Sequence, residues 1–249
     1  MVNYDIDEKE VYRYLGFHEG QHKLTKNMQD LVESCIVSMK NIAQERMIYT
    51  PFLDIVKKDD KTMIDTMELI GTDIMAHLKH CDRAVLMAVT IGNQVDATLR
   101  KYEAIDMTKA VIMDAVSNVL VEKLADICEN EIRMLAKENG LYLTGRYSPG
   151  YGDMPISSQK DLLNILSAER RAGITLTPTN LMIPRKSITA VLGLADIPVT
   201  GKRAGCNHCI MKDKCEYRKR GMTCDYKRKI CNIRWSNRNN VAKEWLAIR

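Results

Sequence analysis

Two long stretches of the chain repeat apolar residues at spacings of three and four, which is the pattern of helices that bury one face. The first stretch covers residues 24–43, and the second and longest runs from 106 to about 139. At a rise of 1.5 Å per residue the second helix is predicted to be about 50 Å long, and Gly140 is placed to end it. Its apolar stripe consists of Ile112, Val116, Val119, Leu120, Leu124, Ile127, Ile132 and Leu135.

A mainly apolar run at 82–92, ending at a glycine, predicts a strand that is buried on both faces. The segment 46–55 also predicts a strand, in which Pro51 indicates an edge position or a bulge. Further strands are predicted at 62–70, 174–177, 180–183 and 187–194. Further helices are predicted at 6–15, 72–79 and 158–172, the last opened by a serine cap and ended by Gly173. Long helices mixed with scattered strands indicate an α+β domain with a mixed or antiparallel sheet.

The composition is that of a soluble globular protein, with 249 residues of which 45% are hydrophobic and 28% charged. The 15 methionines against 2 phenylalanines predict a core filled by flexible thioethers, an interpretation we favour over a methionine-lined cofactor pocket. No apolar run approaches the roughly 18 residues of a membrane span, and the polar start differs from a signal peptide. We therefore expect a cytoplasmic protein whose 8 cysteines are reduced or bound to metal.

Charge divides the chain near residue 200. Residues 201–249 contain 14 Lys and Arg against 4 Asp and Glu, a net charge of +10, whereas residues 1–200 carry a net charge of −5. This asymmetry predicts two parts, a main domain over 1–200 and a small basic, cysteine-rich extension over 201–249.

The segment 145–155 has an unusual order of residues, Gly-Arg-Tyr-Ser-Pro-Gly-Tyr-Gly-Asp-Met-Pro. Pro149 and Gly150 suit the two central positions of a type II turn, because proline fixes φ and glycine accepts a positive φ. Such a turn would hold Arg146 and Tyr151 in a defined relation on either side. Arginine can clamp a carboxylate with two parallel bonds, and an aromatic ring attracts an onium cation. Taken alone, the loop favours a simpler interpretation, a tight turn whose arginine pairs with a surface acid.

Several motifs in order resemble the activation domain of cobalamin-dependent methionine synthase, and such a series is more specific than any one motif. The resemblance covers about 82–194, where 86–92 looks like that family's central strand and the long helix matches in position and in Asp106, Lys109 and Glu122. The other motifs are Arg-x-x-Pro-Gly-Tyr with a later proline, Gly-Ile-x-Leu-Thr, and Met-x-Pro-x-x-Ser-Ile, at 146–151 with 155, 173–177 and 182–188.

The resemblance implies an S-adenosylmethionine site made by Glu122, Arg146, Pro149, Gly150 and Tyr151. For Glu122 an ordinary solvated helix glutamate is the alternative, and both interpretations stay open. The implied function is reductive re-methylation, in which an inactive cob(II)alamin is reduced by one electron and the resulting cob(I)alamin attacks the methyl group. The chain itself would supply no catalytic residue, only orientation of the donor and exclusion of water.

The resemblance also implies partners, because no corrinoid, folate or homocysteine module fits in this chain. We expect a corrinoid-binding protein or the subunits of a split methionine synthase, with a flavodoxin- or ferredoxin-like electron donor. Two features depart from the family: Met154 stands where many members have cysteine, and the later tyrosine-bearing strand has no clear counterpart. These departures keep open a structural subunit that has kept the fold and lost the ligand.

The extension carries five cysteines within residues 206–231, a density that favours a metal site over unrelated reduced thiols. Four thiolates could hold Zn²⁺ or an iron–sulfur cluster, and the spacing matches neither common ferredoxin pattern. The predicted ligands are Cys206, Cys209, Cys215 and Cys224, with His208 and Cys231 as alternates.

The basic triplets 218–220 and 227–229 suit phosphate contacts, and they equally suit docking onto an acidic protein. A solvated charged rim around a small metal knuckle is a third interpretation of equal weight. The alternative function is therefore a regulatory or nucleic-acid-binding protein that senses S-adenosylmethionine and uses the basic metal knuckle. We favour the protein partner over nucleic acid.

Overall fold

The computed structural model describes residues 5–17, 25–58, 61–199 and 213–214. The chain divides into two compact units, Met1–Arg203 and Ala204–Arg249, and the elements below all belong to the first unit.

Seven strands form one sheet in the order β4-β3-β2-β5-β9-β6, and β1 pairs with β5 off this path. Each ladder in the described part of the chain is antiparallel, which settles the predicted mixed or antiparallel sheet as antiparallel. The strands are β1 (Arg46–Tyr49), β2 (Leu53–Lys58), β3 (Lys61–Ile64), β4 (Met67–Glu68), β5 (Arg83–Thr90), β6 (Tyr142–Leu143) and β9 (Ser187–Ala195). A separate two-stranded sheet joins β7 (Thr175–Leu176) and β8 (Met182–Ile183).

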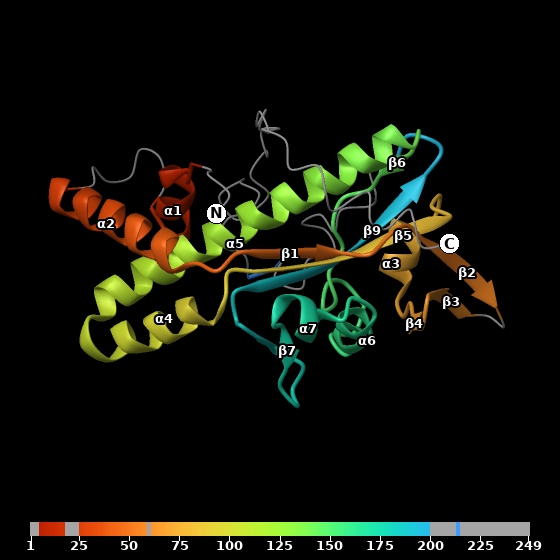
Figure 1. Ribbon diagram of the computed structural model, residues 1–249. Coiled ribbons are helices and arrows are strands. Elements are labelled where there is room, and N and C mark those ends of the chain that lie inside the picture. Colours follow the sequence, from red (N-terminus) through yellow and green to blue (C-terminus); the bar gives the residue numbers. More distant parts are fainter. Residues whose placement is uncertain (1–4, 18–24, 59–60, 200–212, 215–249) are drawn as a thin grey trace. The chain divides into compact units, whose positions relative to one another are not determined.

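Helices cover both faces of the main sheet (Figure 1). The long helix α5 lies across one face and carries α1, α2 and α4 against it, while α6 and α7 pack on the opposite face. The helices are α1 (Glu8–Tyr14), α2 (Lys26–Ile42), α3 (Thr72–His77), α4 (Asn93–Ile105), α5 (Met107–Glu138), α6 (Ser158–Ile165) and α7 (Ala168–Ala172). The long helices against one antiparallel sheet confirm the predicted α+β class.

The central strand β5 is buried along its whole length after Arg83, as its apolar sequence predicts. Alternate residues of β5 pack on opposite faces of the sheet, because successive side chains of a strand point to opposite faces. Ala84, Leu86 and Ala88 join the hydrophobic cluster that contains residues of α6 and α7, which leaves Val85, Met87 and Val89 for the face covered by α5.

The proline in segment 46–55 interrupts the strand as expected, and the flanking pieces β1 and β2 both pair with β5. Thr50 bridges the interruption, since its N–H donates to Leu86 O (3.0 Å) and its hydroxyl accepts from Leu86 N (3.1 Å). The ladder with β5 therefore continues on both sides of Pro51.

Two predicted elements are wrong because each is broken by a residue with positive φ. The strand predicted at 62–70 is a hairpin of β3 and β4, which turns at Asp65 (φ 52°). The helix predicted at 158–172 is divided into α6 and α7 at Ser167, whose backbone is left-handed (φ 50°). The serine preceding α6 makes no side-chain capping bond, so the predicted cap is also wrong, whereas Gly173 ends α7 as predicted.

The sequence pattern gives no element at 93–105, where the structure has α4. Its start is preceded by Gly92 without a side-chain cap, and only Val95, Asp96 and Leu99 are buried. Two apolar core residues in 13 positions are too few to produce a recognisable helical stripe.

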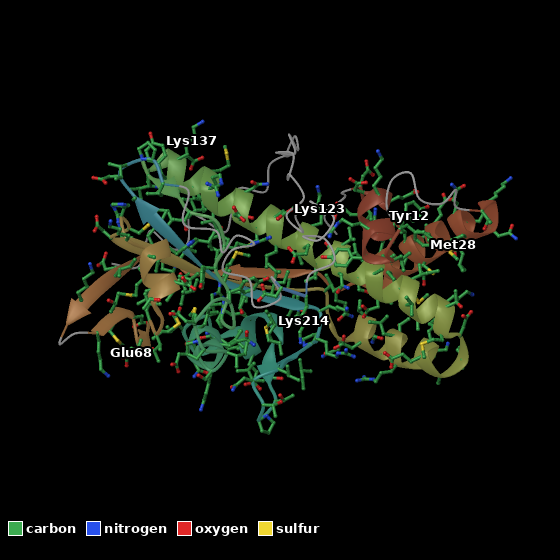
Figure 2. The ribbon with its side chains drawn as sticks, turned by 180° about the vertical axis from the view of Figure 1, so that it is seen from behind. Tyr12, Met28, Glu68, Lys123, Lys137 and Lys214 are labelled. Carbon is green, nitrogen blue, oxygen red and sulfur yellow. The ribbon has the colours of Figure 1, made fainter. Side chains whose placement is uncertain are left out.

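The long helix is confirmed, with Asp106 as its N-cap and its end just before Gly140. Its predicted stripe is buried except for Leu135, which is partly exposed. Figure 2 shows Lys123 and Lys137 along α5 and Glu68 on β4 from the other side.

Several methionines fill the core as predicted: Met39, Met67, Met87 and Met154 are all nearly or fully buried. Within the described ranges, no helix is both long and apolar enough to cross a bilayer.

Candidate functional site

The candidate loop begins as a continuation of β6 along β9. Thr144 N donates to Gly193 O (2.9 Å), and Tyr147 exchanges two backbone hydrogen bonds with Val191 (2.9 and 2.8 Å). Consecutive side chains in this extended stretch therefore point to opposite faces. Arg146 contacts α5 on one face, and Tyr147 joins the hydrophobic cluster on the other.

Arg146 is held by three carboxylates of α5, and its side chain is only 8% exposed. Its Nη2 lies 3.1 Å from Glu122 Oε2 and 3.0 Å from Asp126 Oδ1, and its Nε lies 3.5 Å from Glu129 Oε2. The three acids share one face of the helix because they are spaced by four and three residues. Arg133 continues this network, since it pairs with Glu129 (2.7 Å) and donates to the carbonyl of Leu143 (2.8 Å), the last residue of β6.

The third nitrogen of the guanidinium differs from the other two in its hydrogen bonding. Arg146 Nη1 is buried and has no hydrogen-bond partner, a state shared in the described residues only by Asp96 Oδ1. A buried donor without a partner costs free energy, so such a group calls for an explanation such as a ligand or an ordered water.

The turn predicted at Pro149–Gly150 is present. Tyr151 N donates to Ser148 O (3.1 Å), which closes the four-residue turn, and Gly150 has a φ of 89°. Two further bonds extend the turn into a compact loop, from Gly150 N to Met154 O and from Met154 N to Tyr151 O (both 3.0 Å). Met154, the residue that departs from the family pattern, is buried in the hydrophobic cluster and so anchors the loop.

Tyr147 contacts the turn through both its hydroxyl and its ring. Its hydroxyl donates to Tyr151 O (3.2 Å), and its ring lies between those of His77 (5.1 Å) and Tyr151 (6.5 Å, edge to face). Burial, with smaller contributions from the charges of Asp73 and Asp153, raises the pKa of Tyr147 to about 12. The hydroxyl therefore stays protonated and able to donate at physiological pH.

Asp153 ties the end of the loop to helix α3. Its Oδ2 accepts from Thr72 N (2.6 Å) and Thr72 Oγ1 (2.7 Å), and its Oδ1 accepts from Asp73 N (3.0 Å). These bonds hold the pKa of Asp153 below its ordinary value, the hydroxyl of Thr72 having the largest effect. The carboxylate thus caps a helix that lies about 80 positions earlier in the sequence.

The structure brings some of the predicted site residues into contact. Glu122 and Arg146 form an ion pair, Pro149 and Gly150 form the turn, and the Tyr151 ring is 59% exposed beside it. Their assignment to a ligand stays a prediction. Sequence reasoning missed Asp126, Glu129 and Asp153. The spacing from Glu122 could have indicated Asp126 and Glu129, whereas no local signal indicates the partner of Asp153.

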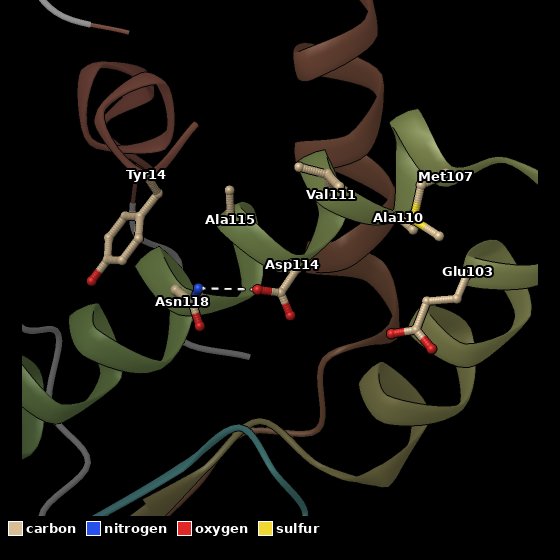
Figure 3. A pocket seen from close by; sticks show the side chains of 8 residues that line it. All are labelled: Tyr14, Glu103, Met107, Ala110, Val111, Asp114, Ala115 and Asn118. Carbon is tan, nitrogen blue, oxygen red and sulfur yellow. Dashed lines mark hydrogen bonds between the residues drawn. The ribbon is translucent and has the colours of Figure 1, made fainter. Parts of the chain in front are cut away.

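A pocket of about 260 Å³ lies between α1, α4 and α5, with Tyr14 on one side and Glu103 on another (Figure 3). Two of its lining residues bind Lys186, whose Nζ donates to Asp114 Oδ1 and Asn118 Oδ1 (both 2.7 Å). None of the predicted ligand residues lines this pocket, although Glu122 follows Asn118 by one helical turn.

The predicted metal ligands Cys206, Cys209, Cys215 and Cys224 lie outside the described residues. Among the residues that are described, no group of His, Cys, Asp and Glu is placed to hold a metal ion. Cys35, Cys81 and Cys128 are free and buried, as their apolar settings suggest.

Comparison with known proteins identifies the fold and the family. The family model of the vitamin B12-dependent methionine synthase activation domain matches residues 33–197, well over half of the chain. The chain belongs to this family. The matched region of this activation domain runs from α2 through the main sheet and the loop 145–155 to the end of β9.

A solved structure supports the fold. The crystal structure of the MetH reactivation domain bound to AdoHcy matches with a TM-score of 0.58 and 17% sequence identity. The match covers 88% of this chain and 82% of that one. A comparison with curated proteins gives no significant match. At this identity the structural likeness establishes the architecture of the activation domain, not its ligand.

Proposed function

We propose that this activation domain binds S-adenosylmethionine at the loop 145–155 and presents its methyl group to a corrinoid carried by a partner. The observation that carries the proposal is the buried, unpartnered Nη1 of Arg146 within the motif of the family. The related reactivation domain was crystallised with AdoHcy, the product that remains when S-adenosylmethionine loses its methyl group.

The surroundings of Arg146 suit the amino-acid end of that donor. Its Nη1 can bind a carboxylate by a charge-assisted hydrogen bond. Glu122 and Asp126 lie on the same guanidinium, and their side chains are 42% and 29% exposed. Carboxylates in this position can attract the ammonium group of the same amino acid.

The turn suits the other end of the donor. The exposed ring of Tyr151 offers a π face to the sulfonium, an attraction of about 0.5–1 kcal/mol at an exposed site. Gly150 supplies the positive φ of the turn (89°), and a Cβ in its place would approach Ile156 Cδ1 to 3.2 Å.

The role of the chain in the reaction is positional. When held by a partner, a reduced corrinoid supplies the nucleophile that accepts the methyl group, so this chain needs no general base. Arg146 and Tyr151 would orient the donor, and the partner surface would close the site against water. Because the corrinoid would be held elsewhere, the proposal calls for a corrinoid-binding protein or split methionine synthase subunits as partners. The reduction of the corrinoid calls for a flavodoxin- or ferredoxin-like electron donor.

Calorimetric titration with S-adenosylmethionine tests the proposal. The wild type is expected to bind, and Arg146→Ala to weaken binding by about 10- to 100-fold, because a hydrogen bond between charged groups is lost. Arg146→Lys is expected to fall between them, since lysine keeps the charge without the planar fork. Tyr151→Ala is expected to cost a factor of about 3 to 5.

Arg100→Ala and Tyr142→Ala serve as matched controls, because both residues are exposed and lie outside the loop. Absence of binding by the folded wild type would contradict the proposal, as would equal affinities of the wild type and Arg146→Ala.

A second candidate function is a sensor of S-adenosylmethionine that binds nucleic acid, and the charge of +10 in residues 201–249 favours it. Phosphate contacts make affinity fall steeply with salt. Fluorescence anisotropy with a labelled duplex at 50 and 200 mM salt is expected to show a loss of about 10³-fold or more if six or more phosphates are contacted. Weak binding that does not change with salt would exclude this candidate.

A further inference from the structure

The approach of the candidate loop to α3 depends on two glycines that face each other across the contact. A Cβ on Gly71 would lie 2.5 Å from Asp153 Oδ1, and a Cβ on Gly152 would clash with Asp73 Oδ2 and lie 2.5 Å from Tyr147 OH. Both glycines have positive φ, 121° and 52°. Neither segment therefore carries a side chain where the Asp153 carboxylate reaches the start of α3.

The carboxylate of Asp153 replaces a cap that α3 does not supply itself. Gly71 occupies the N-cap position, so no side chain of this segment bonds the first amides of the helix. Asp153 accepts from both of those amides, at Thr72 (2.6 Å) and Asp73 (3.0 Å), and from the Thr72 hydroxyl (2.7 Å). A carboxylate at this end of a helix also interacts favourably with the helix dipole.

The same contact restrains Tyr151, which precedes Asp153 by two residues. On one side the backbone of Tyr151 is bound to Ser148 O (3.1 Å), and its carbonyl accepts from Tyr147 OH (3.2 Å). On the other side Met154 is buried in the core. Between these anchors, Asp153 links the segment to α3 by side-chain hydrogen bonds.

We propose that Asp153 is a positioning residue: by capping α3 across the fold it fixes the backbone that presents Tyr151, and so sets the affinity for the methyl donor without touching it. This role rests on the proposed function, because it assumes that S-adenosylmethionine binds at the loop. It adds a residue of the opposite segment, Thr72, to the groups on which binding depends.

The experiment combines amide hydrogen exchange by NMR with calorimetric titration of S-adenosylmethionine on the full chain. In Asp153→Ala the amides of Thr72, Asp73 and Tyr151 are expected to exchange at least about tenfold faster. The affinity for S-adenosylmethionine is expected to fall about tenfold, which matches the loss of one good helix cap. Asp153→Asn is expected to restore only part of both, because its amide oxygen can accept from Thr72 whereas its amide nitrogen cannot accept from Asp73 N.

Two further variants separate positioning from general stability. Thr72→Ala removes only the hydroxyl bond to Asp153 and is expected to give a smaller change in the same direction. Asp161→Ala, which removes an exposed carboxylate in the first turn of α6, is expected to change neither readout.

Unchanged affinity in Asp153→Ala would overturn the positioning role, and so would a lower affinity in Asp153→Asn than in Asp153→Ala. If the wild type does not bind S-adenosylmethionine while exchange at Tyr151 still accelerates in Asp153→Ala, the proposed function fails, but Asp153 does restrain the backbone of Tyr151. If exchange at Tyr151 does not change, Asp153 does not restrain that backbone and the positioning role fails.

Discussion

Burial determines which single residues of this protein have unusual chemistry. Arg146 is only 8% exposed and is surrounded by three carboxylates of α5, and a buried charge is tolerated only when it is paired. For the buried thiols of Cys35, Cys81 and Cys128, burial is the largest effect and raises the pKa. Burial, and then the charge of Asp82, raises the pKa of Cys81 to about 11.

A raised thiol pKa lowers reactivity, since the thiolate is the nucleophile. A shift of the Cys81 pKa from 9.0 to about 11 reduces its thiolate fraction at pH 8 about a hundredfold. Alkylation by iodoacetamide at pH 8, read by peptide mass spectrometry, is therefore expected to be at least about a hundredfold slower in the native protein than in urea. Equal rates in the two states would show that Cys81 is accessible and has an ordinary pKa.

Among the elements, α5 connects the core to the candidate site. One face of the helix carries Leu120 and Leu124, both fully buried, and another carries the carboxylates that hold Arg146. The same periodicity that buries the first face aligns the second. A helix that is fixed by packing thus places Glu122, Asp126 and Glu129 without any adjustment of the loop.

Packing of this helix is expected to dominate its contribution to stability. Leu120→Ala is predicted to lower the free energy of unfolding by about 2–5 kcal/mol, because it leaves a cavity at a fully buried position. Met134→Ala on the same helix is the matched control, and at 58% exposure it is expected to change that free energy by no more than about 0.5 kcal/mol. Urea unfolding of both variants gives the comparison, and equal midpoints would contradict the assignment of the buried face.

At the scale of the whole molecule, a domain of net charge −5 is joined to a basic segment that carries five of the 8 cysteines. The first 200 residues contain the family match, whereas the cysteines from 206 onward fall beyond it. The metal-binding role of this segment remains a prediction from spacing, and it is separable by experiment from ligand binding.

Metal analysis of the purified chain tests this role. We expect about one zinc ion or one iron–sulfur cluster per chain, because four thiolates satisfy either. Cys206→Ser with Cys209→Ser is expected to abolish metal binding and to leave the affinity for S-adenosylmethionine unchanged. Cys35→Ala, at a buried site in α2, is the control that should keep the metal. A wild type purified without metal would contradict the role.

Local patterns were sufficient wherever one stretch of chain decides its own structure. The apolar stripe predicted α5, the mainly apolar run predicted β5, and Pro149–Gly150 predicted the turn, because periodicity and φ preference act over a few residues. The break between α6 and α7 at Ser167 and the hairpin at Asp65 were not predicted, since a non-glycine residue takes positive φ only when surrounding contacts impose it.

The sequence by itself determined the fold class, the family and the loop that carries its motif. Only the tertiary structure decided what that loop touches. The carboxylates around Arg146 lie 17 to 24 positions earlier in the chain, and Thr72 lies 81 positions before Asp153. Contacts at such separations depend on how the sheet and helices pack, and no local preference encodes them.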